Sequence, residues 1–195
     1  MITTEQIKEL RDATGVSVMQ CKKALEEAGG DKEKALIILR KKGGDIAAKK
    51  ADRALGSGAV AAYIHGNGLV GAMVELSSET DFVSKNEEFR KLAYDIAMHV
   101  AASNPIYRAI SDVPADATAR AKEVFVKETA GKNAAIAEKI IEGKLASYFG
   151  EKTLLEQPFI KNPDLTVRQL IESAIQKFGE KIEVARFARF GAGER

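Results

Sequence analysis

The first 44 residues carry apolar side chains at helical spacing. In three short runs, apolar residues recur every three or four positions, which is typical of amphipathic helices that bury one face. A residue that can cap a helix stands before each run: Thr3, Ser17 and Asp31. Glycines that can end a helix follow the runs, at Gly15, at Gly29 and Gly30, and at Gly43 and Gly44. The pattern predicts a three-helix module over residues 1–44.

An alternation of period two begins after residue 56. Two apolar runs, residues 57–65 and 69–77, flank the pair Asn67 and Gly68, which is a strong short-range signal of a β-hairpin. Residues 182–190 alternate again and predict a closing strand. We expect that strand to have one face formed by Val184, Arg186, Ala188 and Phe190, and another formed by Glu183, Ala185, Phe187 and Arg189.

Helical spacing dominates between the hairpin and the closing strand. Helices are expected over about residues 84–103, 116–130, 134–149 and 166–178. The first of them opens with a capping box of Ser84 and Glu87. Residues 45–56, rich in Ala, Lys and Arg, are expected to form a linker or a short helix. The predicted fold class is α+β, with a three-helix module followed by a core, residues 57–195, of helices on a small antiparallel sheet.

The charge of the chain is almost balanced. Lys and Arg number 30, Asp and Glu number 28, and the formal net charge of +2 argues against a dedicated nucleic-acid-binding protein. The single cysteine, Cys21, excludes an intramolecular disulfide and suits a reducing compartment. The amino terminus has no apolar signal segment, and the most apolar stretch is interrupted by five glycines. We therefore predict a cytoplasmic protein without a membrane span.

Residues that could perform catalysis do not form a recognisable set. The string GSGAVA at residues 56–61 precedes a strand, whereas a dinucleotide-binding loop follows a strand and opens a helix. No P-loop or nucleophile-elbow motif is present. His65 and His99 stand 34 positions apart with no cysteine pair beside them, which argues against a zinc site. The sequence predicts no catalytic residue, metal ligand or cofactor, and indicates a protein that binds another macromolecule.

The connection after the predicted hairpin contains an aromatic residue. In the segment SSETDFVSKNEEF, Phe82 lies between Asp81 and Val83, where polar residues and glycine would turn the chain at lower cost. Two interpretations stay open from the residues alone. The ring folds back onto Phe89 or the strand ends, or it is presented to a partner.

Two further residues fit either packing or partner contact. Met19 falls on a charged helix face with Lys22, whereas Val18 aligns with the buried stripe. An exposed methionine is either an adaptable contact residue or an isolated apolar residue. His99 follows Asp95 by one helical turn, so the simpler expectation is a partly buried histidine paired with that carboxylate.

Long motifs in the chain resemble one known family. The chain is similar to bacterial elongation factor Ts in five segments, which stand in the same order: KELRDATGVSVMQCKKALEEAGGDKEKAL, TDFVSKNEEF, IAMHVAASNP, KIIEGKLASYFGEKTLLEQPF and DLTVRQLIE. The first of these resembles the ubiquitin-associated-like module with which that family begins. The resemblance covers nearly the whole chain.

The resemblance implies a non-catalytic guanine-nucleotide exchange factor for elongation factor Tu, the GTPase that carries aminoacyl-tRNA to the ribosome. The loop with which the family disturbs the magnesium site of that GTPase corresponds here to Thr80, Asp81, Phe82 and Val83. Phe82 would be the wedge. By the same similarity, the residues that dock on the partner are Lys8, Arg11, Met19 and His99.

Two departures from the family pattern bear on this contact. Val18 stands where relatives often carry a second methionine beside Met19. The chain has one set of core segments where longer relatives have two related subdomains, so we expect a homodimer of the core to supply the second. Two other classes stay open. An adaptor that binds through its N-terminal module alone would leave TDFV without a role, and an RNA-binding protein that uses residues 40–53 would show strong salt dependence.

Overall fold

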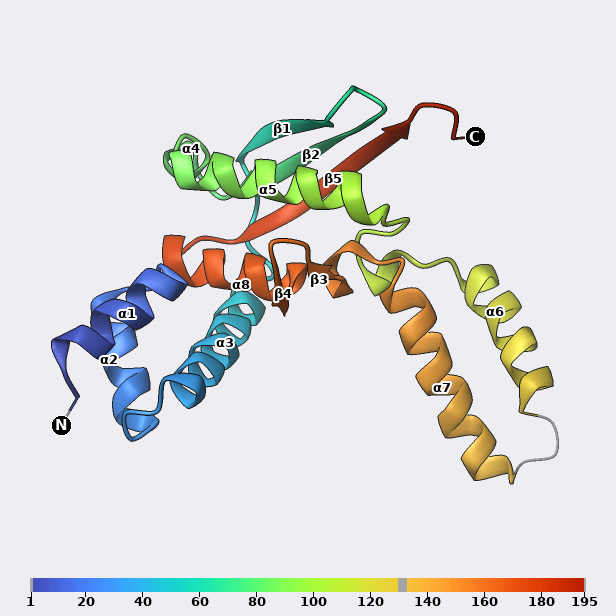
Figure 1. Cartoon of the computed structure of the whole chain (residues 1–195), viewed down its shortest axis with the longest axis horizontal. Helices are drawn as coiled ribbons and strands as arrows, with labels where there is room; N and C mark the ends of the chain where they lie inside the picture. The colour runs from blue at the N-terminus through green and yellow to red at the C-terminus, as the bar shows by residue number, and fades with distance from the viewer. Residues whose placement is uncertain (1, 130–132, 195) are drawn as a thin grey trace.

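The structure, a computed structural model, describes residues 2–129 and 133–194. The elements follow one another as α1 (Thr4–Thr14), α2 (Val18–Glu27), α3 (Lys32–Lys49), β1 (Ser57–His65), β2 (Val70–Ser78), α4 (Asp81–Ser84), α5 (Glu87–Ser103), η1 (Ile110–Asp112), α6 (Ala115–Glu128), α7 (Ala134–Gly150), η2 (Leu154–Glu156), β3 (Pro158–Phe159), β4 (Asn162–Thr166), α8 (Val167–Phe178) and β5 (Ile182–Gly191). The N-terminal helices and the α6–α7 pair extend as two arms from opposite ends of a core that contains the sheet (Figure 1). The predicted α+β class is confirmed.

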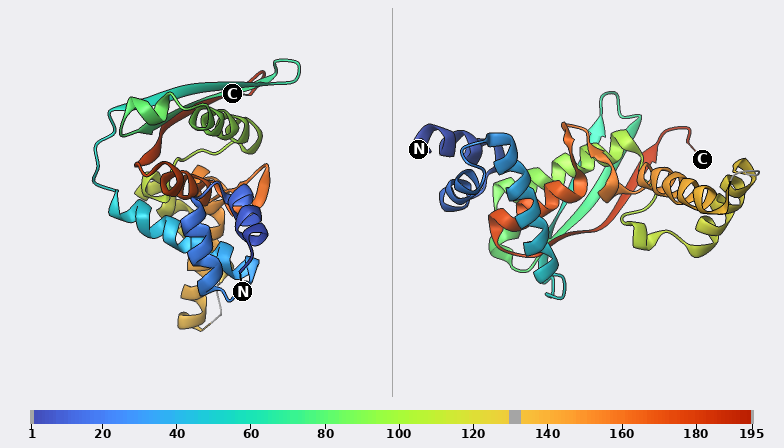
Figure 2. Two further views of the ribbon diagram at one scale, coloured as in Figure 1. Left: turned by 90° about the vertical axis from the view of Figure 1, so that its left-hand side faces the viewer. Right: turned by 90° about the horizontal axis from the view of Figure 1, so that it is seen from below.

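The core is built on a three-stranded antiparallel sheet in the order β1-β2-β5. The hairpin predicted at Asn67 and Gly68 is confirmed, because β1 pairs with β2 from Ser57 to His65. Helix α5 covers one face of the sheet. Helix α8 lies on the far side of α5 and also packs against β5 (Figure 2). Apolar side chains from these elements form the main hydrophobic core, in which Val74 and Ile96 have no exposed surface.

The closing strand forms as predicted, but it does not keep a strict alternation. The register of β5 against β2 shifts after Val184, because the next paired residue is Arg186 and Ala185 has no partner in the ladder. Such a bulge exchanges the two faces of a strand. Val184 and Phe187 therefore both pack on the core, whereas Phe190 is 72% exposed. The predicted faces of this strand are wrong for that reason.

The three helices predicted at the amino terminus and their caps are confirmed. A backbone amide at the start of each helix donates a hydrogen bond to the capping side chain of Thr3, Ser17 or Asp31. Gly15 ends α1 in a left-handed conformation with φ 67°, which a glycine adopts without strain. A small separate core fills the space between the three helices.

The predicted helix end at Gly43 and Gly44 is wrong, since α3 continues to Lys49. The glycines instead allow α8 to lie close to α3. A Cβ atom at Gly43 would lie 3.4 Å from the backbone carbonyl oxygen of Glu172, so the two helices are in near-backbone contact. Residues 45–49, part of the segment expected to form a linker or a short helix, are thus the last part of α3, and the N-terminal module is docked on α8 through that helix.

A helical turn joins β2 to α5. The predicted capping box of Ser84 is wrong, because Ser84 belongs to α4 and its hydroxyl shares a hydrogen bond with that of Ser57 at 2.8 Å. The cap of α5 is Asn86, whose side chain accepts a hydrogen bond from the amide of Glu88. Residues 81–83 of the TDFV segment therefore lie in a short helix of their own, with Thr80 before it, and a separate cap lies between α4 and α5.

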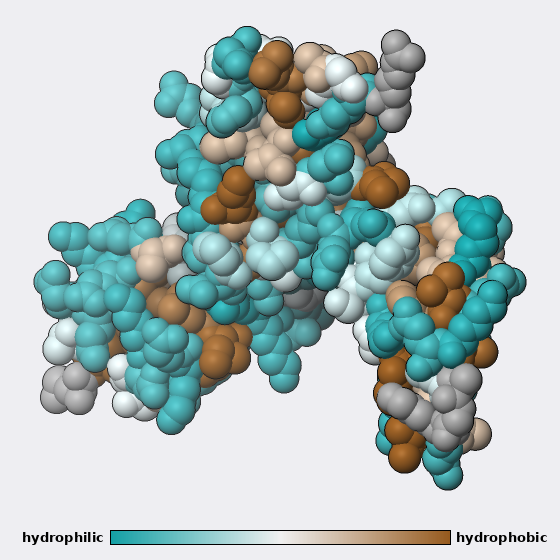
Figure 3. Space-filling model, turned by 45° about the vertical axis from the view of Figure 1, so that its right-hand side comes forward, coloured by the Kyte–Doolittle hydropathy of each residue, from teal (hydrophilic) through white to brown (hydrophobic). Residues whose placement is uncertain are grey.

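The second arm is a hairpin of α6 and α7. Both helices were expected, although the predicted end of the first at Ala130 lies outside the described residues. No residue of α6 is buried, and the two helices pack chiefly on each other. Apolar side chains remain on the surface of this arm, at the right of Figure 3; they include Val124, Ile136 and Tyr148. The arm is held to the core at one end only.

Candidate functional site

The TDFV turn presents its aromatic ring to solvent. Phe82 is 83% exposed, whereas the neighbouring aromatic of α5, Phe89, has no exposed surface and packs edge-on against Phe178. The interpretation that Phe82 folds back onto Phe89 is therefore wrong for the isolated chain. A large apolar side chain with this exposure is a candidate for contact with another protein.

The turn is anchored on its inner side. Val83 is only 3% exposed and belongs to the main core, so it fixes the turn from below instead of reaching outward. On the outer side, Lys85 Nζ donates to Asp81 Oδ2 at 2.6 Å, and this contact holds the pKa of Asp81 below its ordinary range. Asp81 is thus a carboxylate at neutral pH beside an exposed ring.

Two glutamates that the sequence analysis did not select brace the start of the turn. The amide of Thr80 donates to Glu180 Oε2 at 3.0 Å, and the Thr80 hydroxyl donates to Glu180 Oε1 at 2.6 Å. Glu79 accepts the amide of Lys181 at 2.6 Å and also a hydrogen bond from Arg53. The Lys181 amide is the main cause that lowers the pKa of Glu79; desolvation opposes it, and Arg53 lowers the pKa further. Glu180 and Lys181 lie 100 and 102 positions from their partners along the chain, and Arg53 lies 26 positions from Glu79, so local patterns in the sequence do not reveal these contacts.

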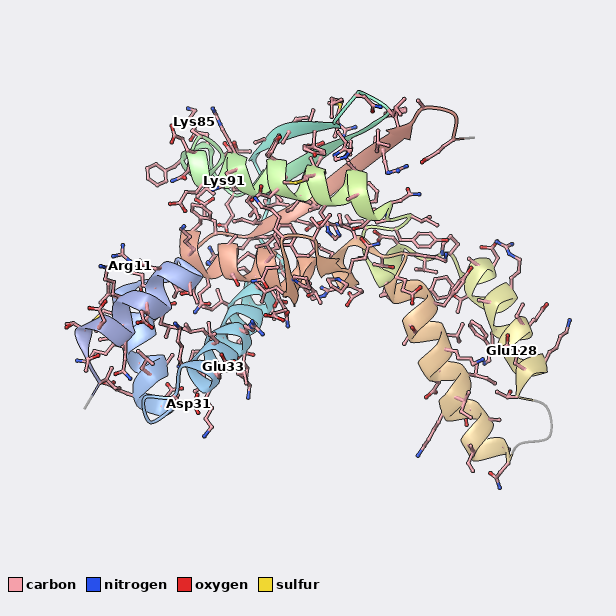
Figure 4. The ribbon with its side chains drawn as sticks, in the orientation of Figure 1. Arg11, Asp31, Glu33, Lys85, Lys91 and Glu128 are labelled. Carbon is pink, nitrogen blue, oxygen red and sulfur yellow. The ribbon has the colours of Figure 1, made fainter. Side chains whose placement is uncertain are left out.

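The candidate docking residues of the N-terminal module are exposed. Lys8 and Arg11 lie on the surface of α1, and Met19 is 64% exposed at the start of α2. The expected burial of Val18 is wrong, since it is 48% exposed in the first turn of α2. Arg11 and Lys85 project at the same end of the molecule (Figure 4), so the module and the TDFV turn share one side.

His99 lies apart from these residues, near the other end of α5. It has no exposed surface, and its Nε2 hydrogen bonds with Gln157 at 3.0 Å while its Nδ1 accepts the amide of Ile160 at 3.2 Å. Burial lowers the pKa of His99, and the bond to Gln157 opposes this. The expected pairing with Asp95 is wrong, because Asp95 accepts a hydrogen bond from Lys161 instead.

The rest of the described chain offers little that resembles a catalytic centre. Residues 2–129 and 133–194 contain no group of three or more His, Cys, Asp or Glu side chains that could hold a metal ion. A cavity of about 300 Å³ lies between α3, α8 and β5, away from Phe82, and the charged residues that line it include Arg108 and Glu183, which are paired with each other. No helix of the described chain is long and apolar enough to cross a bilayer.

Fold and site together define an α+β protein that presents an aromatic side chain on a braced helical turn. The family described as Elongation factor TS matches residues 4–194. Over 196 residues the chain is 51% identical to elongation factor Ts of Carboxydothermus hydrogenoformans, with 100% of this chain and 90% of the relative covered. Over 194 residues it is 50% identical to elongation factor Ts of Desulfotalea psychrophila, with 98% of each chain covered. The chain belongs to the elongation factor Ts family, a family of translation elongation factors, and the resemblance found in the sequence is confirmed.

Proposed function

We propose that this protein is a guanine-nucleotide exchange factor that binds elongation factor Tu in its GDP form and promotes the release of GDP. Membership of the elongation factor Ts family supports the partner and the reaction. The observation that carries the mechanism is the exposure of Phe82 on a turn that is braced on both sides. Burial of such a ring stabilises a complex by about 1.5–3 kcal/mol. The proposed place of action is the cytoplasm.

The turn acts by displacement, and no covalent chemistry is involved. Mg²⁺ requires near-ideal octahedral coordination, so a small shift of the loops that hold it weakens its binding. Phe82 enters the GTPase near the magnesium site and causes that shift. Because coupling between two ligands is reciprocal, the GDP-loaded GTPase also binds this factor more weakly than the empty one does. A thousandfold effect corresponds to about 4 kcal/mol of differential binding, which a few buried contact residues can provide.

The four residues of the turn have different parts in this proposal. Phe82 is the wedge, and Asp81, whose side chain is 69% exposed, meets the partner beside it. Val83 is buried in the main core and the exposed Thr80 is held by Glu180, and these contacts set the direction of the ring. A direct contact with the partner is thus proposed for two of the four residues, and support of the ring for the other two.

The N-terminal module provides the second contact. Lys8 and Arg11 add positive charge to its surface, and the flexible thioether side chain of Met19 can adapt to an irregular apolar patch. His99 takes part indirectly: it is buried, but it holds the amide of Ile160, which is 47% exposed. The proposed role of His99 is therefore to fix the β3–β4 turn at the surface.

We also propose a homodimer formed through the outer face of the sheet. This face carries exposed apolar side chains: Val60 at 62%, Ile64 at 65%, Met73 at 51% and Phe190 at 72%. Adjacent exposed residues of this kind are typical of an interface. Arg186 and Glu75, 2.6 Å apart, form an ion pair on the same face. A two-fold contact needs one self-complementary surface, and an apolar face with both signs of charge provides it.

Stopped-flow release of a fluorescent GDP from elongation factor Tu tests the exchange function. The release rate should rise with the concentration of this protein and reach a plateau, which gives a maximal rate and a half-saturating concentration. A release rate that stays at its spontaneous value at all concentrations would contradict the proposal. Binding of a fluorescent RNA to this protein at two salt concentrations addresses the RNA-binding alternative, because phosphate contacts weaken steeply with salt.

A further inference from the structure

The sheet ladder continues past its last backbone pair through side chains. Strands β2 and β5 end their register at Ser78 opposite Ile182. Extending that antiparallel register by two residues places Glu79 opposite Lys181, and Thr80 opposite Glu180. Both of these pairs are joined by a hydrogen bond from a backbone amide to a glutamate carboxylate. The segment that follows β2 is therefore held to the segment that precedes β5 as far as Thr80, the residue before α4.

Glu180 makes two bonds to one residue. Its Oε2 accepts the Thr80 amide at 3.0 Å and its Oε1 accepts the Thr80 hydroxyl at 2.6 Å, so the two bonds fix both the backbone and the side chain of Thr80. Hydrogen bonds to an ionised acceptor are about twice as strong as neutral ones. Glu180 itself follows Gly179, whose left-handed conformation ends α8, so the carboxylate is aimed from a helix end that packs on the core.

The bond to Glu180 determines how α4 begins. Thr80 occupies the cap position of α4, yet its side chain makes no capping hydrogen bond because its hydroxyl is directed to Glu180. A helix of four residues has little stability of its own. The direction of α4, and with it the direction of Phe82, therefore depends on contacts from outside the turn: the burial of Val83, the bond of Ser84 to Ser57 and, at the residue that precedes the helix, the bonds that hold Thr80.

We propose that Glu180 is a positioning residue for nucleotide exchange: it holds Thr80 so that α4 presents Phe82 in the orientation that enters the GTPase. This inference rests on the proposed exchange function. Glu180 should affect the maximal rate of GDP release. It should not affect the half-saturating concentration, because the N-terminal module forms a separate contact with the GTPase.

Three single variants, the double variant Thr80→Val with Glu180→Ala, and one matched control test the proposal in the full-length chain. Glu180→Ala removes both acceptors, Glu180→Gln keeps one oxygen acceptor, and Thr80→Val removes the hydroxyl but keeps the amide. Glu123→Ala removes one negative charge from the exposed surface of α6, which lies at the opposite end of the molecule from α4 (Figure 1), and serves as the control. Each protein is measured by GDP release from elongation factor Tu and, in isolation, by hydrogen exchange of the Thr80 amide.

We expect Glu180→Ala to lower the maximal release rate about tenfold, which corresponds to about 1.4 kcal/mol, with the half-saturating concentration changed less than twofold. The Thr80 amide should exchange about tenfold faster. Glu180→Gln should recover most of the rate, and Glu123→Ala should match the wild type. Because Thr80→Val and Glu180→Ala break the same link, the double variant should be no more than twofold slower than Glu180→Ala.

Other results overturn the inference. A wild-type maximal rate in Glu180→Ala, unchanged exchange of the Thr80 amide, or a rise in the half-saturating concentration alone would each exclude a positioning role. If the effects of Thr80→Val and Glu180→Ala multiply in the double variant, then Glu180 acts through a contact other than Thr80. Failure of the exchange function itself is distinguishable, since the wild-type protein would then leave GDP release unaccelerated.

Discussion

Replacement of Phe82 by alanine separates a partner contact from a structural role, and the structure gives a magnitude for each. Removal of a buried phenylalanine costs about 3–5 kcal/mol of folding stability, but Phe82 is 83% exposed. Changes at such exposed positions usually stay within about 0.5 kcal/mol. If the ring is buried in the complex, its loss removes about 1.5–3 kcal/mol of binding to the reacting state. This predicts a loss of about 10- to 150-fold in exchange efficiency with nearly unchanged stability.

The assay pairs stopped-flow GDP release with urea unfolding of the same protein samples. Phe89→Ala is the matched control, because Phe89 has no exposed surface and packs against Phe178. That variant should lose several kcal/mol of stability, about the value for a buried ring. A Phe82→Ala protein that is stably folded and exchanges GDP at the wild-type rate would refute the reasoning. A large loss of stability in Phe82→Ala would refute the described exposure of the ring.

Three further predictions follow from the other candidate surfaces. Met19→Ala should raise the half-saturating concentration about five- to tenfold and leave the maximal release rate unchanged; a lower maximal rate alone would argue against a docking role. Light scattering should give twice the mass of the chain at micromolar concentration, and Phe190→Glu should give the mass of one chain; a wild-type monomer would exclude the stable dimer. Burial holds the pKa of His99 below its ordinary value of about 6.5, so the unfolded chain binds a proton more readily, and stability should fall as the pH drops from 7 to 5. The urea midpoint of His99→Gln should therefore fall less between pH 7 and pH 5 than that of the wild type. An identical fall in both proteins would contradict this assignment to His99.

The elements of the fold could be predicted from the sequence where their signals are local. The caps at Thr3 and Asp31 and the hairpin at Asn67 depend on residues within a few positions of one another, and the structure confirms them. The predictions failed where an element that is distant in the sequence packs against the segment. Gly43 lies within α3 because α8 packs against it, and no local signal distinguishes such a glycine from one that ends a helix.

The candidate site shows the same division. The isolated aromatic of the TDFV segment drew attention to Phe82, and its exposure agrees with presentation to a partner. The inward direction of Val83 could not be predicted, because it follows from the packing of α4 on β1 and β2. The brace from Glu180 could not be predicted either, because it depends on the register of β5 against β2. That register contains a bulge at Ala185, and the position of a bulge follows from packing in three dimensions more than from the pattern of a single strand.

The unbroken course of α3 has a consequence for how strongly the two proposed contacts cooperate. A flexible linker at Gly43 and Gly44 would let the N-terminal module move independently, and its tether would only raise the effective concentration of the second contact to the millimolar range. Instead α3 is one helix of 18 residues, about 27 Å long, packed on α8, which also leads into the brace of the TDFV turn. The two contacts are thus presented at a fixed separation, and a partner of matching shape that has engaged one meets the other without a further loss of chain entropy.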